Sequence, residues 1–586
     1  MMGRSTAILG LLALICASHE TKAQLRLFLD NPPNVTGVDE ASDGSIALVG
    51  WFDTAVDLGS EDDPYPLDPI GGKDGFLAAY TADGMLRFAL PFRGITAADE
   101  VVVKGMSRGL DGSYWIVGEL EGDADFDPSG GEYLLSSSTG TSSAFIAHYN
   151  LNGALVSAYS YASESTRSAL YNVVVTQDGD VLATGEANGS VDVQPGSGEL
   201  YFHPAEFRPY FLVAYSSFGT AEFVYQLGSD QYNGYPSTRL AADPTGGAIV
   251  KYGDWPCTDP PCEDPRSYFA RIDSDGTFDD LFWLSSALGV TDIAVDSASR
   301  LRLTGYIWST IDFDPGPEQF LIDTEFPTDA LLVAYDDSNN PIFGFSFGGE
   351  DEILVTTDTG RRIQYDADGS SYLLSTIHGE ADIDPGPGEL IVGIPGAQND
   401  YPSSTTIAKY TLAGELAYGF SLGTIDNYVF SHSLRVNDGQ GYFTFFGVLD
   451  GFANEVATVD IDPGPGVFEI SAEYAFFAAS YSNADGSFPI TTRNSPARYD
   501  PETTSLRPNP FSETTTFSFT PSESGNVRID LFDLLGRRIR TLLDTQVSRG
   551  TRINVSINEA ELPSGVYAIR VMNPSGAYSR LLTKSH

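Results

Sequence analysis

Cysteine, methionine, histidine and basic residues are all scarce in this 586-residue chain. It contains 3 Cys, 5 Met and 6 His, and only 32 Lys and Arg stand against 80 Asp and Glu, for a formal net charge of −48. Residues 24–504 alone carry −52, whereas residues 505–586 carry +3. A field this negative repels nucleic acid and anionic lipid, so neither is an expected partner.

Several motifs of enzymes and membrane proteins are also absent. The chain has no His-Glu-x-x-His pair, no Gly-x-x-x-x-Gly-Lys phosphate loop, and no apolar run after residue 23 that could span a bilayer. One Gly-x-Ser-x-Gly match surrounds Ser107, but it precedes an Asp-Gly hairpin, whereas a hydrolase elbow leads into a helix. We therefore expect no catalytic residues, no cofactor and no membrane-spanning segment.

The three cysteines divide between two parts of the chain. Cys16 lies in residues 1–23, where Arg4, an apolar run and a polar end are typical of a secretory signal peptide. Cys257 and Cys262 remain in the exported chain, and two cysteines there predict one disulfide closing a small loop. The alternative, a zinc site, lacks two further ligands nearby in the sequence.

The residues that are abundant favour strands and turns. The chain has 35 Phe, 30 Tyr, 60 Gly and 34 Pro, and 42% of its residues are hydrophobic. Aromatic residues are enriched in strands, and Gly and Pro in the turns that join them. The expected fold class is all-β.

An Asp-x-Asp-Pro-Gly motif recurs along residues 24–494. Its copies begin at Asp125, Asp312, Asp382 and Asp460, with weaker copies at Asp57 and Asp192. In four units the motif begins 14 residues after the Asp of an Asp-Gly hairpin, at Asp43, Asp111, Asp178 and Asp368. A later strand ends in each unit at Tyr80, Tyr149, Tyr215, Ile272, Tyr335, Tyr410 and Tyr481. The sequence thus contains seven repeats, and in six of them the motif connects the second strand to the third.

Seven repeats of four strands predict a seven-bladed β-propeller over residues 24–494. Residues 25–29 resemble a fourth strand with no unit before it, and such a strand can pair with the last blade and close the ring. An open β-solenoid is the alternative. The fourth repeat lacks the Asp-Pro-Gly motif and carries the two cysteines instead, and the seventh contains an insertion near residues 451–458.

The recurring aspartates have two interpretations. Eight carboxylates could bind Ca²⁺, which prefers oxygen ligands: Asp125, Asp127, Asp312, Asp314, Asp382, Asp384, Asp460 and Asp462. Each copy supplies only two carboxylates, however, and calcium takes roughly six to eight oxygens. We therefore favour a structural turn in which Pro and Gly set the backbone and Asp accepts hydrogen bonds from amides.

The order Asp-Gly, Asp-Phe-Asp-Pro-Gly, Ala-x-Tyr and Gly resembles the β-propeller repeats of exported bacterial proteins. This resemblance covers residues 24–494 and implies the fold. It implies no ligand.

Residues 495–504 are typical of a linker, and residues 505–586 form a separate expected domain. Short alternating strands near residues 514–520, 527–533, 562–570 and 578–583 predict a small immunoglobulin-like β-sandwich. Three motifs and a late lysine there resemble the C-terminal sorting domain of the type IX secretion system (type A). They comprise Pro508, Asn509, Pro510, Asp533, Gly536, Arg537, Gly565, Tyr567 and Lys584.

The resemblance implies handling by the type IX machinery, export through the periplasm, and release or attachment at the outer cell surface. The expected function is non-enzymatic: a displayed binding or adhesion propeller with a glycan or protein ligand on one face. The first alternative is a secreted polysaccharide hydrolase or lyase with acidic residues near the ring axis. The second is a structural surface protein with no small ligand.

Overall fold

The chain folds almost entirely into antiparallel strands, 47 of them with one short 3-10 helix among the described residues. The structure is a computed structural model. It describes residues 25–59, 63–127, 131–137, 140–161, 167–196, 198–204, 209–217, 219–229, 238–254, 266–285, 287–349, 358–394, 403–423, 428–451, 456–463, 468–486, 505–507, 514–519, 524–533, 538–548, 552–558, 565–573 and 576–584. Residues 1–23, residues 495–504 and both Cys257 and Cys262 lie outside these ranges, so the signal peptide, the linker and the disulfide stay predictions.

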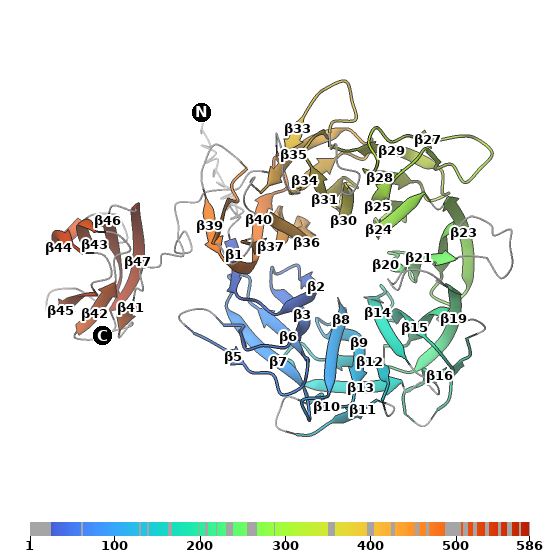
Figure 1. Ribbon diagram of the computed structural model, residues 1–586, viewed down its shortest axis with the longest axis horizontal. Helices are drawn as coiled ribbons and strands as arrows, with labels where there is room; N and C mark the ends of the chain where they lie inside the picture. Colours follow the sequence, from blue (N-terminus) through green and yellow to red (C-terminus); the bar gives the residue numbers. More distant parts are fainter. Residues whose placement is uncertain are drawn as a thin grey trace, which may run out of the picture.

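Seven four-stranded sheets form the blades of a propeller around a common axis (Figure 1). Blade 1 contains β2 (Asn34–Glu40), β3 (Ile46–Phe52), β6 (Asp74–Tyr80) and β7 (Leu86–Gly94). Blade 2 contains β8 (Glu100–Arg108), β9 (Tyr114–Glu121), β12 (Ser142–Tyr149) and β13 (Leu155–Tyr161). Blade 3 contains β14 (Ser168–Val175), β15 (Val181–Ala187), β18 (Pro209–Tyr215) and β19 (Ala221–Ser229). Blade 4 contains β20 (Arg239–Ala242), β21 (Ala248–Asp254), β22 (Arg266–Ile272) and β23 (Phe278–Ser285).

The remaining blades follow the same order, with the first strand of each nearest the axis. Blade 5 contains β24 (Leu288–Val295), β25 (Leu301–Ile307), β28 (Asp329–Tyr335) and β29 (Pro341–Phe347). Blade 6 contains β30 (Thr359–Tyr365), β31 (Ser371–His378), β34 (Ser403–Tyr410) and β35 (Leu416–Leu422). Blade 7 contains β36 (Tyr428–Asn437), β37 (Tyr442–Asp450) and β40 (Tyr474–Ser482), with the helix η1 (Asp438–Gln440) between the first two.

Strand β1 (Leu25–Asp30) completes blade 7 and closes the ring. It pairs antiparallel with β40, placing Leu29 opposite Phe476. The expectation for residues 25–29 is confirmed, and the seven-bladed propeller with it. An open solenoid is ruled out because the first strand lies in the last sheet.

Six short hairpins leave the blades between the second and third strands, at the positions of the Asp-x-Asp motif. They are β4 (Val56–Asp57) with β5 (Pro66–Leu67), β10 (Asp123–Asp125) with β11 (Leu134–Ser136), β16 (Val191–Asp192) with β17 (Tyr201–Phe202), β26 (Ile311–Asp312) with β27 (Leu321–Ile322), β32 (Glu380–Asp382) with β33 (Ile391–Gly393), and β38 (Ala457–Asp460) with β39 (Glu469–Ala472). We call them the rim hairpins, and the side of the ring from which they leave the long-connection face.

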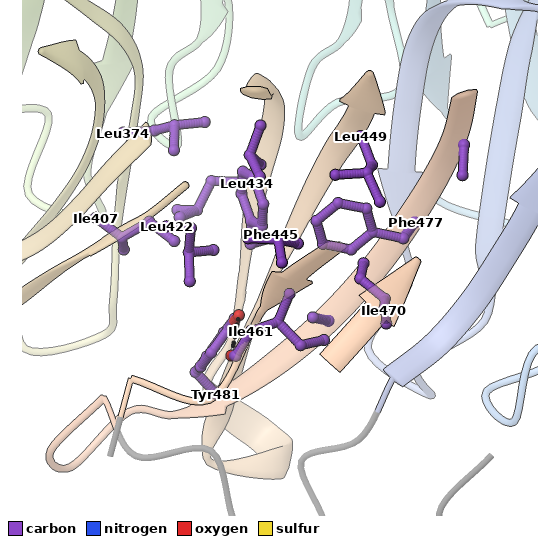
Figure 2. Close-up of a cluster of buried hydrophobic side chains, with 14 of the residues drawn as sticks. Leu374, Ile407, Leu422, Leu434, Phe445, Leu449, Ile461, Ile470, Phe477 and Tyr481 are labelled. Atoms are coloured by element: carbon purple, nitrogen blue, oxygen red, sulfur yellow. Dashed lines mark hydrogen bonds between the residues drawn. The ribbon is translucent and has the colours of Figure 1, made fainter. Parts of the chain in front are cut away.

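The hydrophobic cores lie between neighbouring blades. Figure 2 shows one of them, in which Leu374 and Ile407 of blade 6 pack with Phe445 and Phe477 of blade 7. All four side chains are fully buried. Each buried side chain of this size contributes roughly 1.5–3 kcal/mol, so the blades stabilise one another.

The turn between the third and fourth strands confirms a detail of the repeat. Gly84, Gly153, Gly219 and Gly414 all have φ near +80° there, and Asn339 at the equivalent position of blade 5 has φ 65°. Asn tolerates this left-handed conformation better than other residues with a side chain. The substitution of Asn for Gly therefore preserves the turn.

The C-terminal region contains two sheets. One joins β41 (Ser505–Arg507), β42 (Thr514–Phe519) and β45 (Ile553–Asn558), and the other joins β44 (Arg538–Val547), β43 (Gly525–Asp533), β46 (Gly565–Asn573) and β47 (Gly576–Lys584). Phe517 and Ile557 of the first sheet share a buried cluster with Ile529 and Ile569 of the second. Strands β44 and β45 were missed by the sequence interpretation, and the immunoglobulin-like topology stays a prediction.

Candidate functional site

The first aspartate of each rim hairpin accepts the same two backbone hydrogen bonds. Its Oδ1 atom accepts from the amide two residues later and from the amide eight residues later. The N–O distances are 2.9 and 2.7 Å at Asp57, 2.9 and 2.9 Å at Asp125, 3.0 and 2.9 Å at Asp192, 3.1 and 2.9 Å at Asp312, 3.0 and 2.9 Å at Asp382, and 3.0 and 2.7 Å at Asp460. One carboxylate oxygen therefore closes each hairpin.

The residue after this aspartate anchors the hairpin to the blade. Leu58, Phe126, Val193, Phe313, Ile383 and Ile461 are all fully buried. In five repeats its carbonyl accepts a hydrogen bond from the tyrosine that ends the third strand, as at Tyr149 (2.7 Å) and Tyr410 (2.9 Å). Blade 3 differs, since the Tyr215 hydroxyl makes no hydrogen bond to the Val193 carbonyl and the Tyr215 ring stacks on Tyr161 instead.

The second aspartates hold the turn less firmly. Asp314 and Asp384 each accept one amide, from Gly316 at 2.6 Å and from Gly386 at 2.8 Å. No group of three or more His, Cys, Asp or Glu suited to a metal occurs within the described part of the chain. Calcium binding by the eight aspartates stays a prediction, and a melting curve with and without chelator tests it.

The innermost strands share a β-bulge at one register. The bulge lies between Val35 and Gly37 in β2 and between Val103 and Gly105 in β8, and it recurs in β14, β24, β30 and β36. Bulges re-aim side chains and are common beside functional sites. Unlike the rim, the bulge carries five different residue types in six blades: Thr36, Lys104, Tyr171, Thr291, Arg361 and His432.

A pocket of about 280 Å³ opens between blades 2 and 3 on the long-connection face. Its lining residues are Glu100 and Val102 of β8, Glu119 and Glu121 of β9, Ser142 of β12, and Arg167 before β14. Glu100 and Glu121 face each other directly across β8 and β9. Like charges at directly opposed positions destabilise a sheet. Such a pair is therefore expected to be neutralised by basic residues or to serve in binding a ligand.

Basic residues compensate part of the pocket's charge. Glu119 binds the Arg167 guanidinium at 2.9 Å and the Lys104 ammonium at 3.0 Å, and Glu100 binds the Lys73 ammonium at 2.8 Å. Desolvation lowers the pKa of Arg167, but the charges of Glu119, Tyr171 and Glu186 outweigh it, and the pKa is raised. Glu121 has no ion pair with any described residue.

An aromatic side chain lies beside the pocket. The Lys73 ammonium that pairs with Glu100 also lies over the Trp51 ring, 5.3 Å from its centroid. Trp51 is only partly buried. Carboxylates, a guanidinium and a partly exposed indole therefore converge on this side of the ring.

The sorting residues are described only in part. Asp533 ends β43, Gly565 begins β46, Tyr567 is buried within β46, and Lys584 ends β47. Pro508, Asn509, Pro510, Gly536 and Arg537 lie outside the described residues.

Fold and motifs together define an exported β-propeller protein with a type IX sorting domain. Residues 505–584 match the family model described as a secretion system C-terminal sorting domain. This domain directs export, followed by attachment to or release from the cell surface. Among the described residues no helix has the length and apolar character to cross a membrane.

No curated protein matches the chain. Several solved structures resemble it weakly. A streptogramin B lyase is 11% identical with a TM-score of 0.30 and covers 60% of this chain and 94% of its own. A protein of unknown function from Bacteroides caccae is 8% identical with a TM-score of 0.29 and covers 60% and 91%. An exotype rhamnogalacturonan lyase, YesX, is 10% identical with a TM-score of 0.28 and covers 96% and 91%. Likenesses this weak give no ground for transferring an activity.

The pocket residues Glu100, Glu119, Glu121 and Arg167 were missed by the sequence interpretation. With 80 acidic residues in the chain, no pair stands out. One sequence signal could have indicated the pocket. Glu119-Leu120-Glu121 alternates at the end of a second strand, and this alternation places both carboxylates on one face of the sheet.

Proposed function

We propose that this protein is an exported binding propeller that holds a glycan in the pocket between blades 2 and 3. The observation that supports it is the convergence of three glutamates and one arginine on a single pocket. Carboxylates accept and a guanidinium donates hydrogen bonds, which suits the hydroxyl groups of a sugar. Trp51 adds an apolar ring face nearby, and the pocket's volume suits one or two sugar units.

The test is binding of the purified full-length protein to a glycan panel, followed by titration of the best ligand. Glu121→Gln removes a charged acceptor without an ion-pair partner, and we expect affinity to fall about tenfold or more. Glu222→Gln is the matched control, since Glu222 is exposed on the outer strand β19. Equal affinities of both variants and the wild type would contradict the pocket assignment.

A polysaccharide-cleaving enzyme is the second candidate, supported by the opposed pair Glu100 and Glu121. Directly opposed residues point to the same face of a sheet, so both carboxylates can reach one sugar unit. Glycosidases use such a pair of carboxyl groups flanking the scissile bond. Release of shortened products from a glycan, abolished by Glu100→Gln while binding persists, would favour a hydrolase, and unsaturated products would favour a lyase. Neither binding nor release across the panel would favour a structural surface protein.

A further inference from the structure

Side chains at or beside the level of the bulges connect most of the innermost strands to the next blade. Thr36 Oγ1 donates to the Val103 carbonyl at 2.7 Å (blade 1 to 2), and the Lys104 ammonium lies over the Tyr171 ring (2 to 3). Asn172 donates to the Thr238 carbonyl at 3.2 Å (3 to 4), Arg239 to that of Thr291 (4 to 5), and Thr291 to that of Gly360 (5 to 6). His432 Nε2 donates to the Val35 carbonyl at 2.8 Å (7 to 1). We call these contacts the axial belt.

The belt is interrupted at one junction, between blades 6 and 7. There the two bulge residues are Arg361 and Arg362, and neither forms a hydrogen bond to β36 or an ion pair within the described residues. Arg361 Nε donates to Thr376 Oγ1 at 3.1 Å in its own blade, and Arg362 Nη1 donates to the Arg361 carbonyl at 3.0 Å. Arg361 is exposed and Arg362 partly so. Most of their donors thus remain available.

The innermost strands are also basic in a very acidic protein. Together they carry six Lys or Arg and four Asp or Glu, whereas residues 24–504 carry −52. Besides desolvation, the charge of Arg362 lowers the pKa of Arg239, of Arg361 and of His432. Arg239 donates to the Thr291 carbonyl, and the next residue, Asp292, accepts the amide of Ile363, which directly follows Arg362, so the like charges of Arg239 and Arg362 approach each other around the axis. Such repulsion costs stability unless an anion relieves it.

The neighbouring carboxylate does not fill this role. Asp292 of β24 interacts electrostatically with Arg239, but its Oδ2 atom accepts the Ile363 amide at 3.0 Å. Asp292 is thus shared between Arg239 and the Ile363 amide, so part of its accepting capacity is already used. The cluster has a net positive charge.

We propose that Arg361 and Arg362, backed by the charge of Arg239, form an oxyanion-binding site at the ring axis, which takes a carboxylate or sulfate group of an acidic sugar. Guanidinium groups bind planar or tetrahedral oxyanions through paired N–H donors. The surrounding negative field repels polyanions, so the fitting ligand is a small sugar or oligosaccharide with few acidic groups. This site is separate from the pocket between blades 2 and 3, and it stands whatever that pocket binds.

The experiment is calorimetric titration of the full-length protein with tri-galacturonate, inorganic sulfate and neutral maltotriose at low salt. We expect tri-galacturonate to bind, maltotriose not to bind, and added NaCl to weaken the interaction. Sulfate binding as tightly as tri-galacturonate would support the site and assign it to free oxyanions. Absence of binding by both anions, or equal binding of maltotriose, would overturn the proposal.

Variants locate the site. Arg362→Gln should weaken tri-galacturonate binding about tenfold, and the Arg361→Gln/Arg362→Gln double variant should abolish it. Arg87→Gln, on the outer strand β7, removes the same charge far from the axis and should bind like the wild type. Equal loss in Arg87→Gln would show a general charge effect and overturn the assignment. An unchanged melting midpoint of each variant without ligand shows that the fold is intact.

Discussion

The rim hairpins and the innermost strands are two repeated regions of one ring, and they repeat in different ways. At the rim, six hairpins keep the same aspartate, the same two amide bonds and the same buried anchor. At the axis, six bulges keep one backbone register while the residue at the bulge changes from blade to blade. The repeated side chains of the rim stabilise the fold. At the axis the backbone is repeated but the side chains vary, so one junction, that between blades 6 and 7, can differ from the others.

The rim should give the largest loss of stability. Phe126→Ala removes a fully buried ring that packs 5.4 Å from Phe92 and 5.0 Å from Phe145 between ring centroids, and should cost about 3–5 kcal/mol. Leu134→Ala in the same hairpin is the control, because Leu134 is 48% exposed. Denaturant unfolding measures both, and similar costs would contradict the anchor role.

The axis should show the clearest pH dependence. Desolvation, with Arg362 and Arg435 nearby, lowers the pKa of His432 to about 4, while the Val35 carbonyl opposes the shift. The unfolded chain then binds the proton first, so stability present above about pH 6.5 is lost as pH falls toward 4. At about 1.4 kcal/mol per pKa unit, the loss is on the order of 3 kcal/mol.

His432→Gln separates this contribution from that of the many carboxylates. Its unfolding free energy should fall less steeply than that of the wild type between pH 6.5 and 4, as followed by thermal melts. Identical slopes would show that the protonation of His432 contributes nothing in this window.

The two aspartates of a rim hairpin should differ. Asp312→Ala removes the acceptor of two amides and should cost about 1–3 kcal/mol, whereas Asp314→Ala removes the acceptor of one and should cost about half as much. If the turns are structural, chelator leaves both costs unchanged. A loss of wild-type stability in chelator, absent from both variants, would instead indicate calcium.

The smallest expected loss of stability concerns two tyrosines that occupy the same position in different repeats. Tyr410→Phe removes the donor to the Ile383 carbonyl and should cost about 1 kcal/mol. Tyr215→Phe should cost less, because its hydroxyl makes no hydrogen bond to the Val193 carbonyl. Differential scanning calorimetry resolves the two, and equal shifts in the melting midpoint would contradict the hydrogen-bond assignment.

The sequence predicted the rim far better than the axis. Asp125, Gly153 and Tyr149 recur at fixed spacing because turn geometry requires these residue types, so counting along the chain found every blade. Arg361 and Arg362 are adjacent in sequence, and the repeat pattern says nothing about Arg239, which lies two blades away. Strands β20, β30 and β36 meet around one axis only because the ring closes. The spacing of residues along the sequence does not show which side chains then lie close together. The Glu100–Glu121 pair was hidden for the same reason, since it depends on the register of two strands.

The pairing of β1 with β40 determines when the ring can form. Leu29 cannot meet Phe476 until nearly the whole propeller between them is folded, so closure is a late event with very long-range contacts, which fold slowly. The entropic cost of closing this loop grows only slowly with its length, by about 0.6 kcal/mol for each doubling. Burial of Leu27 and Leu29, each contributing roughly 1.5–3 kcal/mol, outweighs that increment. We therefore expect the ring to close late in folding, and its closed form to depend on the first strand of the chain.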